Sequence, residues 1–257
     1  MANDRVVDFT GIHNFRDYGG YAVEGGGAVR RDVLWRSGQH FDASDEDLGR
    51  LESLSIAHVF DLRSDRERAS HPCRRPAGFG AQVHTVADDS GNHAPHVSSA
   101  RRDAETTRAN MVRSYAGMPY RPLLVAMVRN MIDRLASGDG ASLVNCMAGK
   151  DRTGFAVAMV HHALGVHYDD IVADYLLTNT AGNPEERIAA GMRSVSSLLG
   201  DIEHEALHVL MGVEPEYLAT AWQAMQDSHG SVDAYQADML GVDNALRDRL
   251  RAALLEG

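Results

Sequence analysis

The chain has 257 residues, of which 44% are hydrophobic and 24% charged, values typical of a globular protein with a sizeable core. Its formal net charge of -11 argues against nucleic-acid binding, because no basic stripe offsets the acidic excess. An anionic substrate is still compatible with this charge, since a local cluster of donors can outweigh a screened global field.

The cysteine content and the hydropathy pattern indicate the compartment. Cys73 and Cys146 are the only cysteines, too few for a disulfide framework in a chain of this size, so we expect free thiols in a reducing compartment. No apolar run has the length of a signal peptide core or a membrane span. We therefore expect a cytoplasmic protein with no membrane segment, and leave leaderless secretion open.

The first third of the chain predicts short strands with one helix among them. Residues 14–36 are rich in glycine and predict short strands joined by turns. Ser44 is a helix N-cap, because acidic residues follow it in what would be the first turn. Residues 57–64 and 81–87 predict two buried strands, and residues 88–100 predict an irregular polar segment.

The rest of the chain is predominantly helical. Helices are predicted at 101–115, 121–137, 152–164, 168–179, 214–231 and 242–256, and a strand at 141–145. From Pro184 onward, apolar residues between Ile188 and Ile202 recur at helical spacing, which predicts an amphipathic helix. Strands that alternate with helices, followed by a helical C-terminal half, predict an α/β fold, and the absence of a linker predicts one domain over residues 1–257.

The stretch VNCMAGKDRTG, residues 144–154, has the features of an anion-binding loop. It connects a predicted strand to a predicted helix, so backbone N–H groups and the positive end of the helix dipole would face a ligand. Gly149 lets the backbone approach that ligand closely, and Gly154 favours close packing at the start of the helix. Arg152 can direct two donors at one phosphate group.

Cys146 stands at the start of this loop and is the candidate nucleophile. The loop N–H groups and Arg152 would favour its ionisation to a thiolate, and Thr153 could donate its hydroxyl to the sulfur. The loop is not a Walker phosphate loop, because Lys150 is followed by Asp151 rather than by Ser or Thr. It is also longer than the active loop of a rhodanese-type sulfurtransferase.

Hydrolysis of a phosphate ester also needs an acid for the leaving oxygen. Asp151, beside Arg152, is the first candidate. Asp88 and Asp89 are rivals, because they follow a predicted strand and could act as a mobile acid.

Two further charged groups need an interpretation. Asp61 is a third carboxyl candidate, although with Arg63 it is better explained as a structural ion pair. Lys150 is the only lysine of the chain, and we expect it to place a cation at the rim of the loop, where it would suit an additional phosphate of the substrate.

The segment CMAGKDRTG resembles the signature loop of the cysteine-dependent protein tyrosine phosphatases. Five further segments resemble the bacterial subfamily that has dual protein and phosphoinositide activity: NFRDYGGY, LWRSGQ, VFDLRSDRE, DYLLTN and GSVDAYQADMLGV. The placement of Asp151 is similar to that in myotubularin-type and Sac-type phosphoinositide phosphatases, where an aspartate inside the loop can be the acid. These segments span most of the chain.

The resemblance implies a cysteine-dependent phosphatase fold, with a central, mostly parallel sheet flanked by helices. It implies Cys146 as nucleophile, Arg152 as phosphate clamp and the backbone from Met147 through Ala148, Gly149 and Lys150 to Asp151 as the oxyanion cradle. The expected reaction is hydrolysis of phosphotyrosine, phosphoserine or phosphothreonine, or phosphoinositides through a phosphocysteine intermediate, without metal or other cofactor. The resemblance also implies a helical lid at about 183–210, although the apolar stripe there fits core packing equally well.

One residue departs from the family pattern. The family usually has a histidine directly before the nucleophile, where this chain has Asn145. Asparagine can form hydrogen bonds but cannot carry a charge, so we expect a less acidic thiol than in the histidine-bearing relatives. The alternative function is a catalytically weak protein that binds a phosphorylated ligand, with Asn145 marking lost activity.

Overall fold

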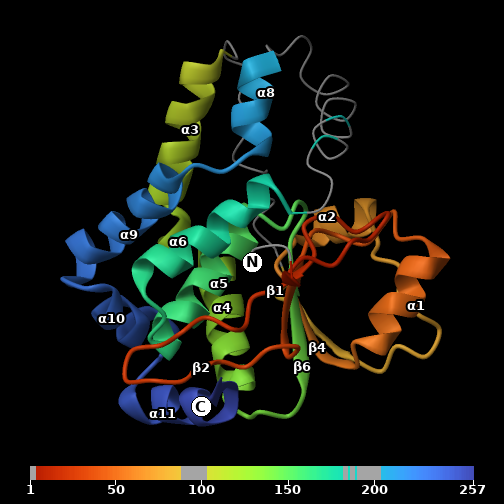
Figure 1. Ribbon diagram of the computed structural model, residues 1–257. Coiled ribbons are helices and arrows are strands. Elements are labelled where there is room, and N and C mark those ends of the chain that lie inside the picture. Colours follow the sequence, from red (N-terminus) through yellow and green to blue (C-terminus); the bar gives the residue numbers. More distant parts are fainter. Residues whose placement is uncertain (1–3, 88–102, 182–184, 186–188, 190–203) are drawn as a thin grey trace.

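The fold is described from a computed structural model, in which residues 4–87, 103–181, 185, 189 and 204–257 are placed. Within these residues the strands form two sheets (Figure 1). The strands are β1 (Arg16–Asp17), β2 (Ala28–Val29), β3 (Leu34–Ser37), β4 (Ile56–Asp61), β5 (Gln82–His84), β6 (Ala141–Asn145) and β7 (Leu255–Glu256).

The larger sheet has the strand order β1-β3-β6-β4-β5. Its three pairings among β3, β6, β4 and β5 are parallel, and only β1 runs antiparallel to its neighbour β3. The predicted mostly parallel sheet is therefore confirmed. Strand β6 lies in the middle of this sheet, so the loop that follows it opens at the carboxyl ends of the parallel strands, where open α/β sheets bind ligands. The smaller sheet pairs β2 with β7, close to the C-terminus.

Ten α-helices lie within the described residues, and their order along the chain matches most of the predicted pattern. They are α1 (Asp45–Ser53), α2 (Asp65–Ser70), α3 (Ala104–Ala116), α4 (Pro122–Leu135), α5 (Asp151–Leu164), α6 (Tyr168–Leu176), α8 (His204–Met211), α9 (Pro215–His229), α10 (Val232–Tyr235) and α11 (Asn244–Leu254). Ser44 caps α1 as expected, and Gly165 ends α5 with φ of 88°, a left-handed conformation that glycine adopts without strain.

Helices cover both faces of the larger sheet. Figure 1 shows α1 and α2 on one side and α4, α5, α6, α9 and α11 on the other. The alternation of side chains along β6 explains the two layers, because Leu143 joins the smaller apolar cluster with Trp35 and Val59, whereas Val144 joins the larger one.

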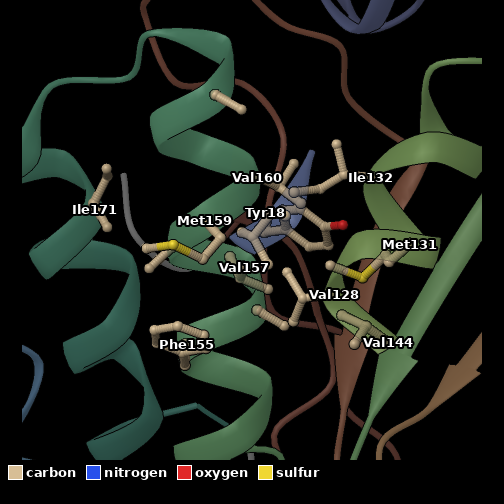
Figure 2. Packing of buried hydrophobic residues seen from close by; sticks show 14 of the residues in the cluster. Tyr18, Val128, Met131, Ile132, Val144, Phe155, Val157, Met159, Val160 and Ile171 are labelled. Atoms are coloured by element: carbon tan, nitrogen blue, oxygen red, sulfur yellow. The ribbon is translucent and has the colours of Figure 1, made fainter. Parts of the chain in front are cut away.

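Helix α5 is buried along nearly its whole length, which fixes the position of the loop before it. Figure 2 shows its residues Phe155, Val157, Met159 and Val160 among side chains of neighbouring elements. These four are at most 1% exposed. A helix that is apolar on all sides needs neighbours on all sides, and here they are the sheet, α4, α6 and α11. The N-terminus of α5 therefore has little freedom to move.

A few short elements differ from the sequence-based expectation, and two segments cannot be compared. Helices α2 and α10 and strand β7 were not predicted: α2 has no buried residue, α10 has only four residues, and β7 only continues the end of a helix. The predicted irregular segment 88–100 lies outside the described residues, and so does most of the expected lid at about 183–210, of which α8 is the described end.

Candidate active site

The candidate site is the loop between β6 and α5. Strand β6 ends at Asn145, Cys146 follows it, and α5 begins at Asp151. The predicted strand, loop and helix are thus all present. The polypeptide between them forms a single turn whose shape is set by contacts with β1, β3 and the segment after β3.

The carbonyl groups of this loop point outward, toward the rest of the protein. The backbone N–H of Gln39 donates to the carbonyl of Met147 at 3.0 Å. The side-chain amide of Asn14 donates to the carbonyls of Ala148 at 3.5 Å and Gly149 at 2.7 Å. In a trans peptide the C=O and the following N–H point in opposite directions, so the N–H groups that follow these carbonyls point into the loop. This arrangement suits an oxyanion.

Gly149 is the tightest point of the loop. Its φ of +67° is left-handed, and a Cβ there would lie 2.5 Å from backbone atoms of Ser37 and Gly38. Its carbonyl also accepts a hydrogen bond from Arg36 at 3.1 Å. This close backbone approach is to the segment after β3, whereas the predicted approach of Gly149 to a ligand remains a prediction.

A buried ion cluster holds Arg36 and Asn14 in place. Arg36 donates to Asp174 at 2.5 Å, and the Nε of Arg16 lies 3.5 Å from the same carboxylate. Arg16 also donates to the side-chain oxygen of Asn14. Burial would raise the pKa of Asp174, but the two guanidinium groups outweigh it and lower that pKa to about 2. All three charged side chains are at most 1% exposed, so the loop rests on a fixed support.

Arg152 is oriented by a carboxylate that the sequence did not single out. Its two terminal nitrogens each donate to one oxygen of Glu67 at 2.7 Å, and one of them also donates to the carbonyl of Leu62 at 3.2 Å. Burial lowers the pKa of Arg152, but the Glu67 hydrogen bonds and the Cys146 and Glu67 charges outweigh it and raise that pKa.

Of the five N–H donors of an arginine, these bonds use three. The remaining two are the Nε–H and one N–H of the adjacent terminal nitrogen. They form one edge of the planar guanidinium, a geometry suited to two oxygens of one phosphate. Arg152 can therefore keep its bonds to Glu67 while it holds a phosphoryl group.

Cys146 lies at the base of the loop and is 3% exposed. It lies near enough to Arg152 for a thiolate charge on its sulfur to contribute to the raised pKa of that arginine. The expected hydrogen bond from Thr153 to this sulfur is not formed: the Thr153 hydroxyl is buried and has no hydrogen-bond partner among the described residues. Both cysteines are free thiols, as predicted.

Asn145 is held by the ion pair that the sequence predicted. Arg63 donates to Asp61 at 2.8 and 2.7 Å, and both side chains are at most 3% exposed, so their structural pairing is confirmed. The amide of Asn145 donates to the same Asp61 carboxylate at 3.3 Å. Asp61 is therefore committed to a structural role in this structure.

Asp151 stands at the first position of α5, where its carboxylate contacts a buried tyrosine. Tyr115 donates to Asp151 Oδ1 at 2.7 Å, and the hydroxyls of Tyr115 and Tyr175 lie 2.7 Å apart. The ammonium of Lys150 lies 3.4 Å from the same Oδ1. Its rivals Asp88 and Asp89 lie outside the described residues.

The position of Lys150 corrects one expectation. Lys150 is only 5% exposed, and its ammonium donates to the carbonyls of Leu210 and Gly212 at 2.6 and 2.9 Å. It therefore does not stand as an exposed cation at the rim but ties the loop to the end of α8. The sequence identified the lysine as unusual, whereas its direction depends on a turn 60 residues away.

The segments that carried the family resemblance surround this loop. They supply Asn14 and Arg16, then Arg36, then Asp61 and Glu67, and finally Asp174. Sequence analysis missed the roles of Glu67, Tyr115 and the Arg16–Arg36–Asp174 cluster. The pattern Ser64-x-x-Glu67 could have indicated a helix capped by Ser64 with Glu67 in its first turn, but no pattern indicated the contact of Glu67 with Arg152.

Comparison with known proteins identifies the family. The tyrosine phosphatase family pattern matches residues 7–256. A Cupriavidus necator protein whose name assigns it to the tyrosine-protein phosphatases is 35% identical over 257 residues, covering 97% of this chain and 88% of that protein. The Mycobacterium tuberculosis triple specificity protein phosphatase PtpB is 31% identical over 282 residues, covering 97% of this chain and 99% of that protein.

Solved structures give weaker matches that add nothing to this assignment. P. aeruginosa TpbA aligns with 70% of this chain and 86% of its own at 18% identity and a TM-score of 0.34. A human tyrosine phosphatase-like serine/threonine/tyrosine-interacting protein aligns with 69% of this chain and 88% of its own at 14% identity and a TM-score of 0.34.

The chain belongs to the tyrosine phosphatase family. It is a hydrolase of the protein-tyrosine-phosphatase class, which acts on a phosphorylated substrate and releases phosphate. None of the helices in the described ranges combines the length and hydrophobicity needed to cross a bilayer.

Proposed function

We propose that this loop hydrolyses phosphotyrosine through a phosphocysteine intermediate, with Cys146 as nucleophile, Arg152 as phosphate clamp and Asp151 as acid and base. The observation that carries the proposal is the bidentate Arg152–Glu67 pair, which leaves one guanidinium edge of Arg152 for a phosphate. The proposed phosphate-binding residues are the backbone from Met147 to Asp151 together with Arg152 and Thr153.

In the first step the Cys146 thiolate attacks phosphorus in line with the ester bond. An S–P bond forms, the P–O ester bond breaks, and its electron pair leaves with the substrate oxygen. Asp151 gives its proton to that oxygen, so the product leaves as an alcohol or phenol. The loop N–H groups and Arg152 hold the three equatorial oxygens and stabilise the charge on them.

In the second step water attacks the phosphocysteine. Asp151, now a carboxylate, takes a proton from the water, the new P–O bond forms, and the S–P bond breaks with its electron pair returning to sulfur. Phosphate is released and the thiolate is restored. The net reaction consumes one water per ester, and each group returns to its initial protonation state.

The substrate range is the finer part of this proposal. A relative carries the name triple specificity protein phosphatase, which supports a range wider than phosphotyrosine for this chain, with phosphoserine and phosphothreonine included. Phosphoinositides present the same phosphate dianion and could use the same loop. We nevertheless rank phosphotyrosine first, because the Lys150 ammonium, the cation expected to favour lipids, is bonded to the carbonyls of Leu210 and Gly212.

Turnover of p-nitrophenyl phosphate, a phosphotyrosine peptide and a phosphoinositide panel by the wild type and Cys146→Ser tests the proposal. We expect turnover of the peptide that disappears in the variant, and a phosphocysteine adduct that accumulates after acid quench in Asp151→Asn. Phosphate binding without turnover by the wild type would support the alternative, a phospho-ligand binding protein. Full activity of Cys146→Ser would contradict the nucleophile assignment.

A further inference from the structure

Two buried tyrosines form a hydrogen-bonded chain that ends at the carboxylate of Asp151, and the three residues come from three helices. Tyr115 comes from α3, Tyr175 from α6, and Asp151 from the first position of α5. The two tyrosines are at most 1% exposed, and the Asp151 side chain is 15% exposed. Asp151 therefore lies at the boundary between a closed tyrosine cluster and the site.

The direction of the hydrogen bonds follows from what each group can donate. An ionised carboxylate only accepts, so Tyr115 uses its single O–H to donate to Asp151 Oδ1 at 2.7 Å. Tyr175, 2.7 Å away, must then donate to the Tyr115 oxygen. The chain of donors runs from Tyr175 through Tyr115 to Asp151, and the Lys150 ammonium lies 3.4 Å from the same Oδ1 of Asp151.

Tyr115 is suited to remain a donor at every pH at which the enzyme works. Burial is the main reason that its pKa lies well above 10, and the nearby Asp151 charge raises it further. Its ring is also held in place, with the ring of Tyr175 at 6.3 Å and that of Tyr217 at 5.5 Å between centroids. A hydroxyl that neither ionises nor rotates away offers the carboxylate a fixed anchor.

We propose that Tyr115 is a positioning residue for the phosphatase reaction, which holds Asp151 in the orientation needed for proton transfer. This inference rests on the proposed role of Asp151 as acid and base. Tyr115 acts through Asp151 and needs no contact with the substrate.

Two consequences distinguish positioning from a structural role. A fixed acid matters most for a leaving group that needs its proton, so loss of the anchor should harm phosphotyrosine more than p-nitrophenyl phosphate. The Tyr115 O–H also stabilises the carboxylate relative to the carboxylic acid. Without this hydrogen bond Asp151 keeps its proton to higher pH, so the basic limb of the pH profile of kcat/KM should shift to higher pH.

The experiment compares Tyr115→Phe with Tyr175→Phe in the full chain. Both variants remove one buried hydroxyl from the same cluster and keep the ring, but only the first removes a donor to Asp151. For Tyr115→Phe we expect kcat/KM on a phosphotyrosine peptide to fall about tenfold, the effect of one hydrogen bond to a charged group. On p-nitrophenyl phosphate the loss of kcat/KM should be at most about threefold. The basic limb of the pH profile should shift to higher pH by roughly one unit.

Tyr175→Phe should change each rate by about twofold at most, because the bond from Tyr115 to Asp151 persists. Equal losses on both substrates with an unmoved basic limb would show a structural role and overturn the proposal, as would a Tyr115→Phe variant with wild-type kinetics. If Tyr115→Phe does not fold, 3-fluorotyrosine at position 115 gives the opposite test. The fluorinated phenol is a stronger hydrogen-bond donor, so the basic limb of the pH profile of kcat/KM should shift to lower pH. A basic limb at the wild-type pH would contradict the proposal.

The variant Asp151→Asn separates this proposal from the one on which it rests. If Asp151→Asn keeps wild-type activity on phosphotyrosine, Asp151 is not the acid and both proposals fail. If Asp151→Asn is impaired and Tyr115→Phe is not, only the positioning role fails. Tyr115→Phe combined with Asp151→Asn should be no slower than Asp151→Asn alone, because Tyr115 acts through that carboxylate.

Discussion

Asn145 stands where the family resemblance led us to expect a histidine, and the structure gives this position a physical context. Its amide donates to Asp61 at 3.3 Å, while its own side-chain oxygen is buried without a hydrogen-bond partner among the described residues. A histidine at this position would lie beside the same carboxylate and could carry a positive charge. That charge would act on the neighbouring Cys146.

We predict that Asn145→His increases the thiolate fraction of Cys146 at a given pH. The pH of half-maximal iodoacetamide alkylation should fall by about one unit, the usual effect of one nearby opposite charge. A Cys73→Ser background leaves Cys146 as the only thiol, so the alkylation rate reports one sulfur. If half-maximal alkylation of Asn145→His occurs at the same pH as in the wild type or at a higher pH, the predicted role of this position is refuted.

Local spacing predicted the positions of the loop residues better than the directions of their side chains. Cys146, Gly149 and Arg152 stand in the predicted order between strand and helix, because that order depends on residues no more than six positions apart. Lys150 was placed wrongly at the rim, because its partners are carbonyls of residues 210 and 212. Hydrogen-bond partners that lie so far apart in the chain cannot be predicted from the spacing of neighbouring residues.

At the scale of elements, two helices begin with the same capping arrangement but differ in their relation to the site. Ser44 caps α1 and Ser64 caps α2, each in a reciprocal pair with the acidic residue three positions later. In α1 that residue is Asp47, which also accepts from backbone N–H groups near the N-terminus. In α2 it is Glu67, which holds Arg152.

We predict that Ser64→Ala lowers both stability and activity. Loss of the cap should cost about 1 kcal/mol of the free energy of unfolding. The first turn of α2 should also become looser, so that Glu67 holds Arg152 less firmly in its position. We expect kcat/KM to fall by about threefold, because part of the lost 1 kcal/mol then also raises the activation barrier. Urea unfolding and steady-state kinetics measure the two effects.

Ser44→Ala is the matched control for this prediction. It removes the same kind of cap from a helix whose acidic partner does not contact the loop, so we expect a similar loss of stability and unchanged kcat/KM. Equal kinetic effects of the two variants would show that activity follows general stability and not the position of Glu67.

The strength of each local pattern explains which helices and strands could be predicted from the sequence and which could not. Strand β6 and helix α5 were predicted nearly to the residue, since a short apolar strand and a helix ended by glycine are strong local patterns. Helix α2 was missed, because its six residues include no buried one and supply no apolar stripe. Its capping box and the Arg152–Glu67 pair tie its start to the rest of the protein.

At the scale of the whole molecule, the loop depends on a charge cluster assembled from distant segments. Arg16 lies in β1, Arg36 in β3 and Asp174 in α6, so 158 residues separate the first from the last. The sequence segments that contain these residues were part of the family resemblance, but nothing in their spacing indicated that they meet. Tertiary packing alone brings the three charges together, and it places the loop support at the junction of the sheet with α6.

We predict that Asp174→Asn destabilises the fold in a pH-dependent way. The variant leaves two buried guanidinium groups without their carboxylate, which should cost on the order of 3 kcal/mol at pH 7. The pKa of Asp174 is lowered from 3.8 to about 2 in the folded protein, so its contribution is fully present above pH 3.8 and is lost as the pH falls toward 2. The difference in unfolding free energy between wild type and variant should therefore be constant from pH 7 to 5 and shrink below pH 4.

Urea unfolding of both proteins across this pH range measures the difference. The control is Asp227→Asn, at an exposed helical position, which should change stability by less than about 0.5 kcal/mol. A difference at pH 7 no larger than that of the control, or one that already declines between pH 7 and 5, would rule out Asp174 as the ionised centre of this cluster.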